Sequence, residues 1–120
     1  MDIGFERQHL TDLLTALGSA HPYLPDRISP PSYIVTPGSP FVTSGQTYAT
    51  GTIHFDVTFV ASVKPNAQAG KNLDDAVSAA VEVLLPAGYK LEQVSEPFAL
   101  NANNATFAAI TLTVNNPCDL

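Results

Sequence analysis

Cysteine and basic residues are scarce in this sequence. The single cysteine, Cys118, can form neither an internal disulfide nor a cysteine-based zinc site, so nothing indicates an oxidising compartment. Five Lys and Arg residues stand against eleven Asp and Glu, which gives a formal net charge of −6 at pH 7. Because this charge opposes the counterion-release term that supplies most nucleic-acid affinity, a DNA-binding module is disfavoured.

Long apolar runs are also missing. None approaches the roughly 20 residues that a membrane-spanning helix needs. The first ten residues, MDIGFERQHL, are charged and lead into no apolar stretch of the kind found in signal peptides. We therefore expect a soluble, unprocessed protein. Of its 120 residues 45% are hydrophobic and 13% charged, which is typical of a globular chain, so we expect a single domain over residues 1–120.

Two helices are predicted from the spacing of apolar residues. The first covers residues 5–17, where leucines recur along one helical face and Gly18 follows as a stop. These leucines are Leu10, Leu13, Leu14 and Leu17. A proline-rich connector over 21–31 excludes a helix, because prolines fix φ and lack an N–H. The second helix is predicted over 73–85, with Asn72 as its N-cap and acidic residues in its first turn.

Four strands are predicted, over residues 32–35, 52–63, 89–100 and 107–114. The second has the strongest signal, because apolar and polar residues alternate along it with a period of two. Two hairpins joined by a helical crossover predict an α+β fold, with one mixed four-stranded sheet and both helices packed on one face. Residues 115–120 are expected to be a frayed tail.

His54 and Asp56 are the pair of residues best suited to chemistry. They lie two apart on the polar side of the predicted strand over 52–63, so their side chains point the same way. An imidazole beside a carboxylate could serve as a general base or as half of a metal site. No third ligand lies at a recognisable spacing, and no hydrolase elbow or phosphate-binding loop occurs. We therefore expect no catalytic residue, no metal ligand and no cofactor, and assign the pair to a polar or interface surface.

The segment over residues 37–51 is a candidate assembly surface. It is rich in Thr, Ser and Gly and almost uncharged, so it lacks the apolar surface to order itself, and we interpret it as a long loop or an extended hairpin tip. Phe41, Val42 and Tyr48 would anchor a partner there, and His54 and Asp56 on the neighbouring strand are further candidates for the interface. A hairpin tip without any partner explains the same residues. The weakly charged edges of an open sheet are a second reason to expect assembly.

The order of these elements is characteristic. A leucine-striped helix and a proline-rich connector precede the strand TIHFDVTFVASV, the helix NLDDAVSAAVEVLL and a hairpin ending ATFAAITLTV. Between Leu10 and Val114 the chain thus resembles the small tail terminator, or tail-completion, proteins of long-tailed bacteriophages. The resemblance implies a non-enzymatic virion protein, assembled in the host cytoplasm, that forms a ring, typically a hexamer, at the head-proximal end of the tail. Its implied partners are other copies of itself, the tail-tube protein and the head connector.

Three readings of function remain open at this point. DNA would pass through a terminator ring without specific binding, and the negative charge is compatible with that passage. Another head-to-tail joining component, such as a head-closure or minor tail protein, would share the same assembly logic. A small hydrolase or metal-dependent enzyme would instead use His54 and Asp56. No membrane partner is expected for any of them.

Overall fold

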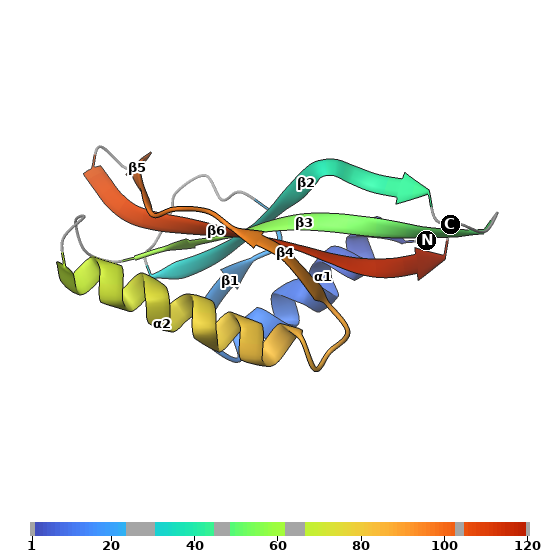
Figure 1. Ribbon diagram of the computed structural model, residues 1–120, viewed down its shortest axis with the longest axis horizontal. Coiled ribbons are helices and arrows are strands. Elements are labelled where there is room, and N and C mark those ends of the chain that lie inside the picture. The colour runs from blue at the N-terminus through green and yellow to red at the C-terminus, as the bar shows by residue number, and fades with distance from the viewer. Residues whose placement is uncertain (1, 24–30, 45–48, 62–66, 103–104, 120) are drawn as a thin grey trace.

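The computed structural model describes residues 2–23, 31–44, 49–61, 67–102 and 105–119. These residues form two helices and a mixed open sheet of six strands (Figure 1), which confirms the predicted α+β class. The elements are α1 (Ile3–Thr15), β1 (Ser19–His21), β2 (Ser32–Ser44), β3 (Thr50–Val60), α2 (Ala67–Leu84), β4 (Lys90–Val94), β5 (Phe98–Ala102) and β6 (Ala105–Asp119).

The strand order is β1-β2-β3-β6-β4, and β5 also pairs with β6. The β1–β2 pair is parallel and the other pairs are antiparallel. The helical crossover joins β3 to β4. Both run antiparallel to β6, so they are parallel to each other as predicted, but β6 lies between them.

The predicted number of four strands is wrong for two reasons. β1 has three residues, too few to show a period of two, and it lies between Gly18 and the proline-rich connector, of which it includes only His21. The strand predicted over 89–100 is divided into β4 and β5 around Pro97, which has no N–H to donate. Ser95 holds this break against β6. Its N–H donates to the carbonyl of Thr111 at 2.8 Å, and its Oγ accepts from the Thr111 N–H at 3.0 Å.

The expected frayed tail over 115–120 is strand as far as Asp119. β6 runs on beyond its predicted end at Val114, because β3 supplies pairing partners for residues 109–119. Cys118, for example, lies opposite Gly51 in this ladder. The local composition predicted an unstructured C-terminal segment, but β3 of the hairpin formed by β2 and β3 pairs with this segment and extends the sheet.

The helix boundaries differ from those predicted. α1 starts at Ile3 because Asp2 caps it, with its Oδ1 accepting from the Phe5 N–H at 3.0 Å. α2 starts at Ala67, so Asn72 lies inside the helix instead of capping it. Alanine-rich sequence favours this earlier start, and Gln68 donates a hydrogen bond to Asn72 one turn on, at 3.0 Å.

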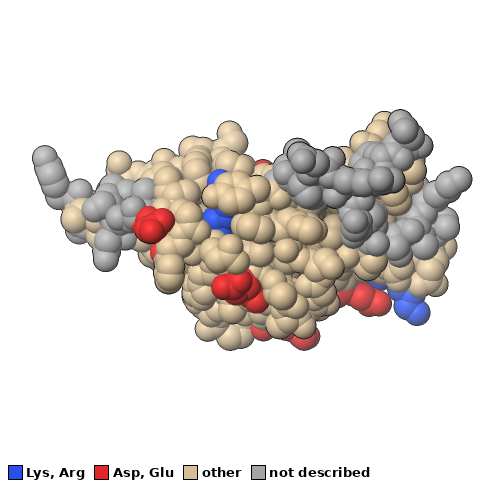
Figure 2. All heavy atoms as spheres, turned by 180° about the vertical axis from the view of Figure 1, so that it is seen from behind, with Lys and Arg blue, Asp and Glu red and all other residues tan. Residues whose placement is uncertain are grey.

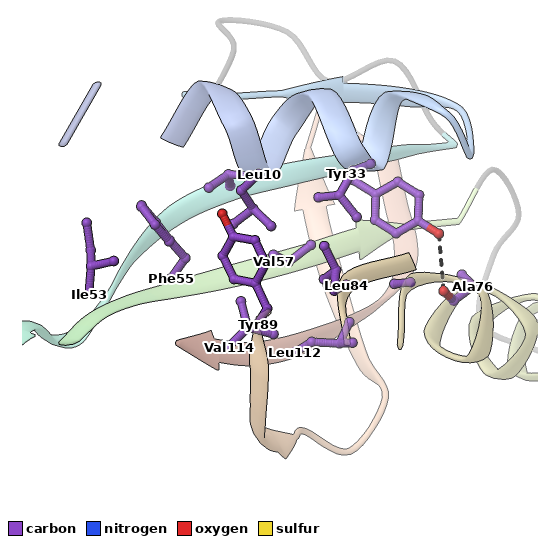
Figure 3. Close-up of a cluster of buried hydrophobic side chains, with 13 residues drawn as sticks. Leu10, Tyr33, Ile53, Phe55, Val57, Ala76, Leu84, Tyr89, Leu112 and Val114 are labelled. Carbon is purple, nitrogen blue, oxygen red and sulfur yellow. Dashed lines mark hydrogen bonds between the residues drawn. The ribbon is translucent and has the colours of Figure 1, made fainter. Parts of the chain in front are cut away.

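One buried cluster joins both helices to the sheet (Figure 3). The predicted alternation in β3 is confirmed from Ile53 to Val57, because Ile53, Phe55 and Val57 are fully buried, but it breaks at Val60, which is also fully buried and ends the strand. From the helices come Leu10, Leu14, Ala76, Ala80 and Leu84, and from β6 come Leu112 and Val114. The two helices cover different strands, since α1 contacts β1 and β2 whereas α2 contacts β6. The predicted helix packing on a four-stranded sheet is therefore only partly matched.

Tyr89 lies in this cluster and gives a pH-dependent prediction. Its hydroxyl is buried and has no hydrogen-bond partner among the described residues. Burial, with a smaller contribution from the charge of Glu6, raises the pKa of Tyr89 from 10.0 to about 12. Since the folded state holds this proton more tightly, the associated stability is complete below pH 10 and is lost as the pH rises toward 12.

We expect Tyr89→Phe to remove this dependence. The substitution deletes a hydroxyl that makes no hydrogen bond to the described part of the chain, so the free energy of unfolding at pH 7 should stay equal or rise. Between pH 10 and 12 its decline should become shallower, by up to about 1.4 kcal/mol per pH unit, the contribution of one proton. Urea unfolding over this range measures both effects. A parallel decline in the two proteins would contradict the prediction.

Candidate functional site

A group of polar side chains lies on the face of the sheet opposite the buried cluster. β3 places His54 and Asp56 there because each alternates with a buried residue. In β6, Thr113 and Asn115 lie opposite them in the strand ladder and therefore share this face. Sequence analysis thus placed both β3 residues on the correct side of the strand.

His54 links three strands through its two ring nitrogens. Its Nδ1 lies 2.7 Å from Oε1 of Glu92 in β4, and its Nε2 lies 3.2 Å from Oγ1 of Thr43 in β2. Glu92 also accepts a hydrogen bond from Asn115 of β6 at 3.0 Å. The His54 side chain is 12% exposed and that of Glu92 34%. The imidazole is therefore held by the fold from both sides.

Two irregularities in the backbone lie beside this arrangement. In β4 the pairing with β6 shifts between Leu91 and Gln93, and Glu92 is the extra residue. In β2 the register shifts between Pro37 and Val42, across from His54. Gly38 passes so close there that a Cβ atom would lie 2.8 Å from the Cβ of His54 and 2.9 Å from its carbonyl carbon. Glycine is needed at this contact because no side chain fits.

Asp56 has partners separate from those of His54. Its Oδ1 accepts a hydrogen bond from Thr113 at 2.9 Å, and its main-chain carbonyl accepts from Thr36 at 3.3 Å. In the part of the chain that the structure describes, no group of three or more His, Cys, Asp or Glu residues could hold a metal ion. The two residues that the sequence paired are thus each tied into the sheet through a different contact.

The segment over residues 37–51 is a hairpin in its described part. Residues 37–44 belong to β2 and residues 50–51 to β3, so the expected long loop is mostly strand. Phe41 and Val42 are half-buried and pack against the main cluster. The ring of Phe41 meets that of Phe55 edge-on, with centroids 5.7 Å apart. Tyr48 lies outside the described residues.

Sequence analysis missed an exposed apolar strip along one edge of the sheet. This edge strip consists of Leu85, just after α2, and Leu91 and Val94 of β4, together with Phe98 of β5, which lies along the same edge but on the other face of the sheet. Their exposed fractions are 48%, 38%, 38% and 39%. The signal was present, because Leu91 and Val94 are three apart and the bulge at Glu92 brings both opposite buried β6 residues. A spacing of three inside a strand indicates such a bulge.

A groove lies on the other side of α2 and was also missed. The α2 groove has a volume of about 740 Å³. Its sides are formed by α2 and by the turn between α1 and β1, and its floor by β2 and β3. Its lining residues include Ser19, Tyr33, Phe59, Asp75 and Ala76. This volume falls within the range typical of binding sites.

Two further observations concern a possible membrane-spanning helix and the similarity of the chain to known proteins. Among the described residues, no helix is both long enough and apolar enough to cross a bilayer. A comparison of the chain with models of known protein families finds no match, and a search among curated proteins finds none either.

Proposed function

We propose that this chain is a structural subunit of a virion that assembles head to tail into a ring. In the manner of a phage tail terminator, the ring would cap the tail tube and present a docking surface to the head. The observation that carries the proposal is the edge strip. Four large apolar side chains exposed along one edge of a sheet favour an interface between proteins.

The position of the strip suits a head-to-tail contact. It lies at the β4–β5 edge, whereas β1 lies at the other end of the strand order. A subunit that joins its neighbour through two different surfaces forms a closed ring when the rotation between copies permits. Opposite edges of one sheet provide two such surfaces.

The polar face and the overall charge are compatible with this role. His54 and Asp56 stabilise the sheet through contacts with Glu92 and Thr113, and these contacts require no substrate. Figure 2 shows acidic side chains at several separate places on the face seen from behind. With a net charge of −6, a ring of such subunits would repel DNA phosphates and allow DNA to pass without adhering.

The oligomeric state tests the proposal. At tens of micromolar, alone or mixed with tail-tube protein, the chain is expected to elute as a multimer of defined mass in size-exclusion chromatography with light scattering. Electron microscopy should then show rings. A strict monomer under both conditions would overturn the proposal.

A second experiment separates the terminator from another head-to-tail joining protein. Loss of a terminator should leave tails that grow beyond their normal length, because nothing stops tube polymerisation. Loss of a head-closure protein should leave tails of normal length that are not attached to heads. The lengths of tails in lysates of a deletion mutant therefore distinguish the two roles.

A further inference from the structure

We propose that Thr43 is a reactive hydroxyl, activated by His54, that accepts the acyl group of an activated ester. On the polar face a hydroxyl, an imidazole and a carboxylate form a chain, contributed by Thr43 of β2, His54 of β3 and Glu92 of β4. A hydroxyl nucleophile is activated when a base contacts it and a third group orients the base, and this chain has that order. The reactivity is a property of the single chain and does not depend on ring assembly.

The two ring nitrogens of His54 have the polarity that this chemistry needs. Nδ1 lies 2.7 Å from Oε1 of Glu92, and because a carboxylate only accepts hydrogen bonds, Nδ1 carries the proton of the neutral ring. Nε2 keeps its lone pair and lies 3.2 Å from Oγ1 of Thr43, so the threonine hydroxyl donates to it. The imidazole is therefore placed to remove the hydroxyl proton when Thr43 attacks a carbonyl carbon.

The base is held in place while the hydroxyl remains within reach. Glu92 accepts a second hydrogen bond on the same oxygen, from Asn115 at 3.0 Å, which fixes the group that orients the ring. The imidazole is largely buried, whereas Thr43 is half-buried and lies one residue before the end of β2. A base that is already oriented needs little reorganisation during the reaction, and a small reagent can approach the hydroxyl beside it.

Other threonine hydroxyls on this face lack an imidazole partner. Oγ1 of Thr58 lies 3.0 Å from the hydroxyl of Thr111, and Thr113 donates to the carboxylate of Asp56 at 2.9 Å. A hydroxyl is a very weak base, and a carboxylate is a weaker base than an imidazole. Of these hydroxyls, Thr43 is thus the one that we expect to react.

The acyl transfer exchanges one ester for another. Oγ1 of Thr43 forms a bond to the carbonyl carbon of the ester while Nε2 of His54 takes the hydroxyl proton. The bond from that carbon to the leaving oxygen then breaks, and the leaving group takes the proton from the imidazolium. An acyl ester of Thr43 and a free alcohol or phenol result. Water, deprotonated by His54 in the same way, later releases the acid and restores the hydroxyl.

The substrate class follows from what the site supplies. The chain of three side chains provides a nucleophile and a base, but none of its contacts provides a donor for the negative charge that develops on the carbonyl oxygen. An ester with a good leaving group depends least on such a donor. Aryl esters are therefore the class of compound that we expect to react.

Mass spectrometry after brief exposure to p-nitrophenyl acetate tests the assignment. In the wild-type protein the acetyl group should be found on Thr43, accompanied by release of p-nitrophenol. His54→Gln should slow this acetylation about 100-fold or more, as is usual for the loss of a general base. Thr43→Val should abolish it, whereas Thr43→Ser keeps a hydroxyl in place and should retain it.

Glu92 is a positioning residue, and the tautomer of His54 reports its role. Nitrogen NMR of the wild-type ring should show the proton on Nδ1. In Glu92→Gln the side-chain amide can donate as well as accept, so the preference for this tautomer should weaken and acetylation should slow about tenfold or more. Slower acetylation with an unchanged tautomer would contradict this role.

Two controls separate this chemistry from general reactivity. Thr58→Val removes a hydroxyl without an imidazole partner from the same face, and His9→Gln removes an exposed imidazole. Both should leave acetylation of Thr43 within about twofold of the wild-type rate, and thermal unfolding shows that each variant is folded. Absence of the acetyl group from Thr43, equal acetylation of Thr58, or an unchanged rate in His54→Gln would overturn the proposal and leave ring assembly untouched.

Discussion

Replacing Phe55 with alanine is expected to lower the free energy of unfolding by about 3–5 kcal/mol, the usual cost of removing a buried phenylalanine. Phe55 is fully buried in the middle of β3, between β2 and β6. Its ring also supports Phe41, which meets it edge-on at 5.7 Å. The substitution therefore leaves a cavity and removes the contact that holds the bulged part of β2 against the sheet.

Urea unfolding followed by circular dichroism measures this loss. Because total stabilities of about 5–15 kcal/mol are usual, the alanine variant could be too unstable to purify, and Phe55→Leu then provides a milder second point. Phe5→Ala is the matched control, since its ring is 65% exposed and its removal should change the unfolding free energy by no more than about 0.5 kcal/mol. Equal effects of Phe55→Ala and Phe5→Ala would contradict the position assigned to Phe55.

The parts of the fold that follow a regular period could be predicted from sequence. β3 is the clearest case, because residues 53–57 alternate strictly and pack as the alternation requires. The leucines of α1 likewise predicted the face on which Leu10 and Leu14 are buried. In both cases the sequence pattern is local, because the same face of the helix or strand is buried at each successive turn of the helix or at every second residue of the strand.

Prediction failed where distant segments determine the local structure. The three residues of β1 are strand because they pair with β2, and residues 115–119 are strand because β3 extends alongside them. Residues 37–44 contain two prolines and a glycine, so the sequence left a long loop and an extended hairpin tip as alternatives. They nevertheless join the sheet, because the register shift opposite His54 accommodates the irregular stretch.

The candidate site was predicted in part for the same reason. Alternation along β3 was enough to place His54 and Asp56 on one face. Their partners could not be foreseen, because Glu92 lies in a strand that β6 separates from β3. The α2 groove depends on how α2 lies relative to the turn after α1, and no local pattern encodes that relation.

The second large effect concerns association rather than folding. In the edge strip, Leu85 and Val94 are exposed by 48% and 38% in the single chain. If a neighbouring subunit covers them, the double variant Leu85→Gln, Val94→Thr should weaken association about 10- to 30-fold, because less apolar area is then removed from water on binding. Threonine keeps the β-branched shape of valine, so β4 should remain paired with β6.

Sedimentation velocity over a range of concentrations measures the midpoint of assembly, and thermal unfolding at low concentration shows that the single chain is intact. Phe5→Gln is the matched control, because it makes a similarly exposed apolar side chain polar on α1, away from the strip. If apolar side chains anywhere on the surface promoted association, the control and the double variant would associate equally weakly, which would contradict the prediction. Weaker association in the double variant alone would show that the exposed edge forms the contact. Both the double variant and the control lose apolar surface, and they differ only in the position of that surface.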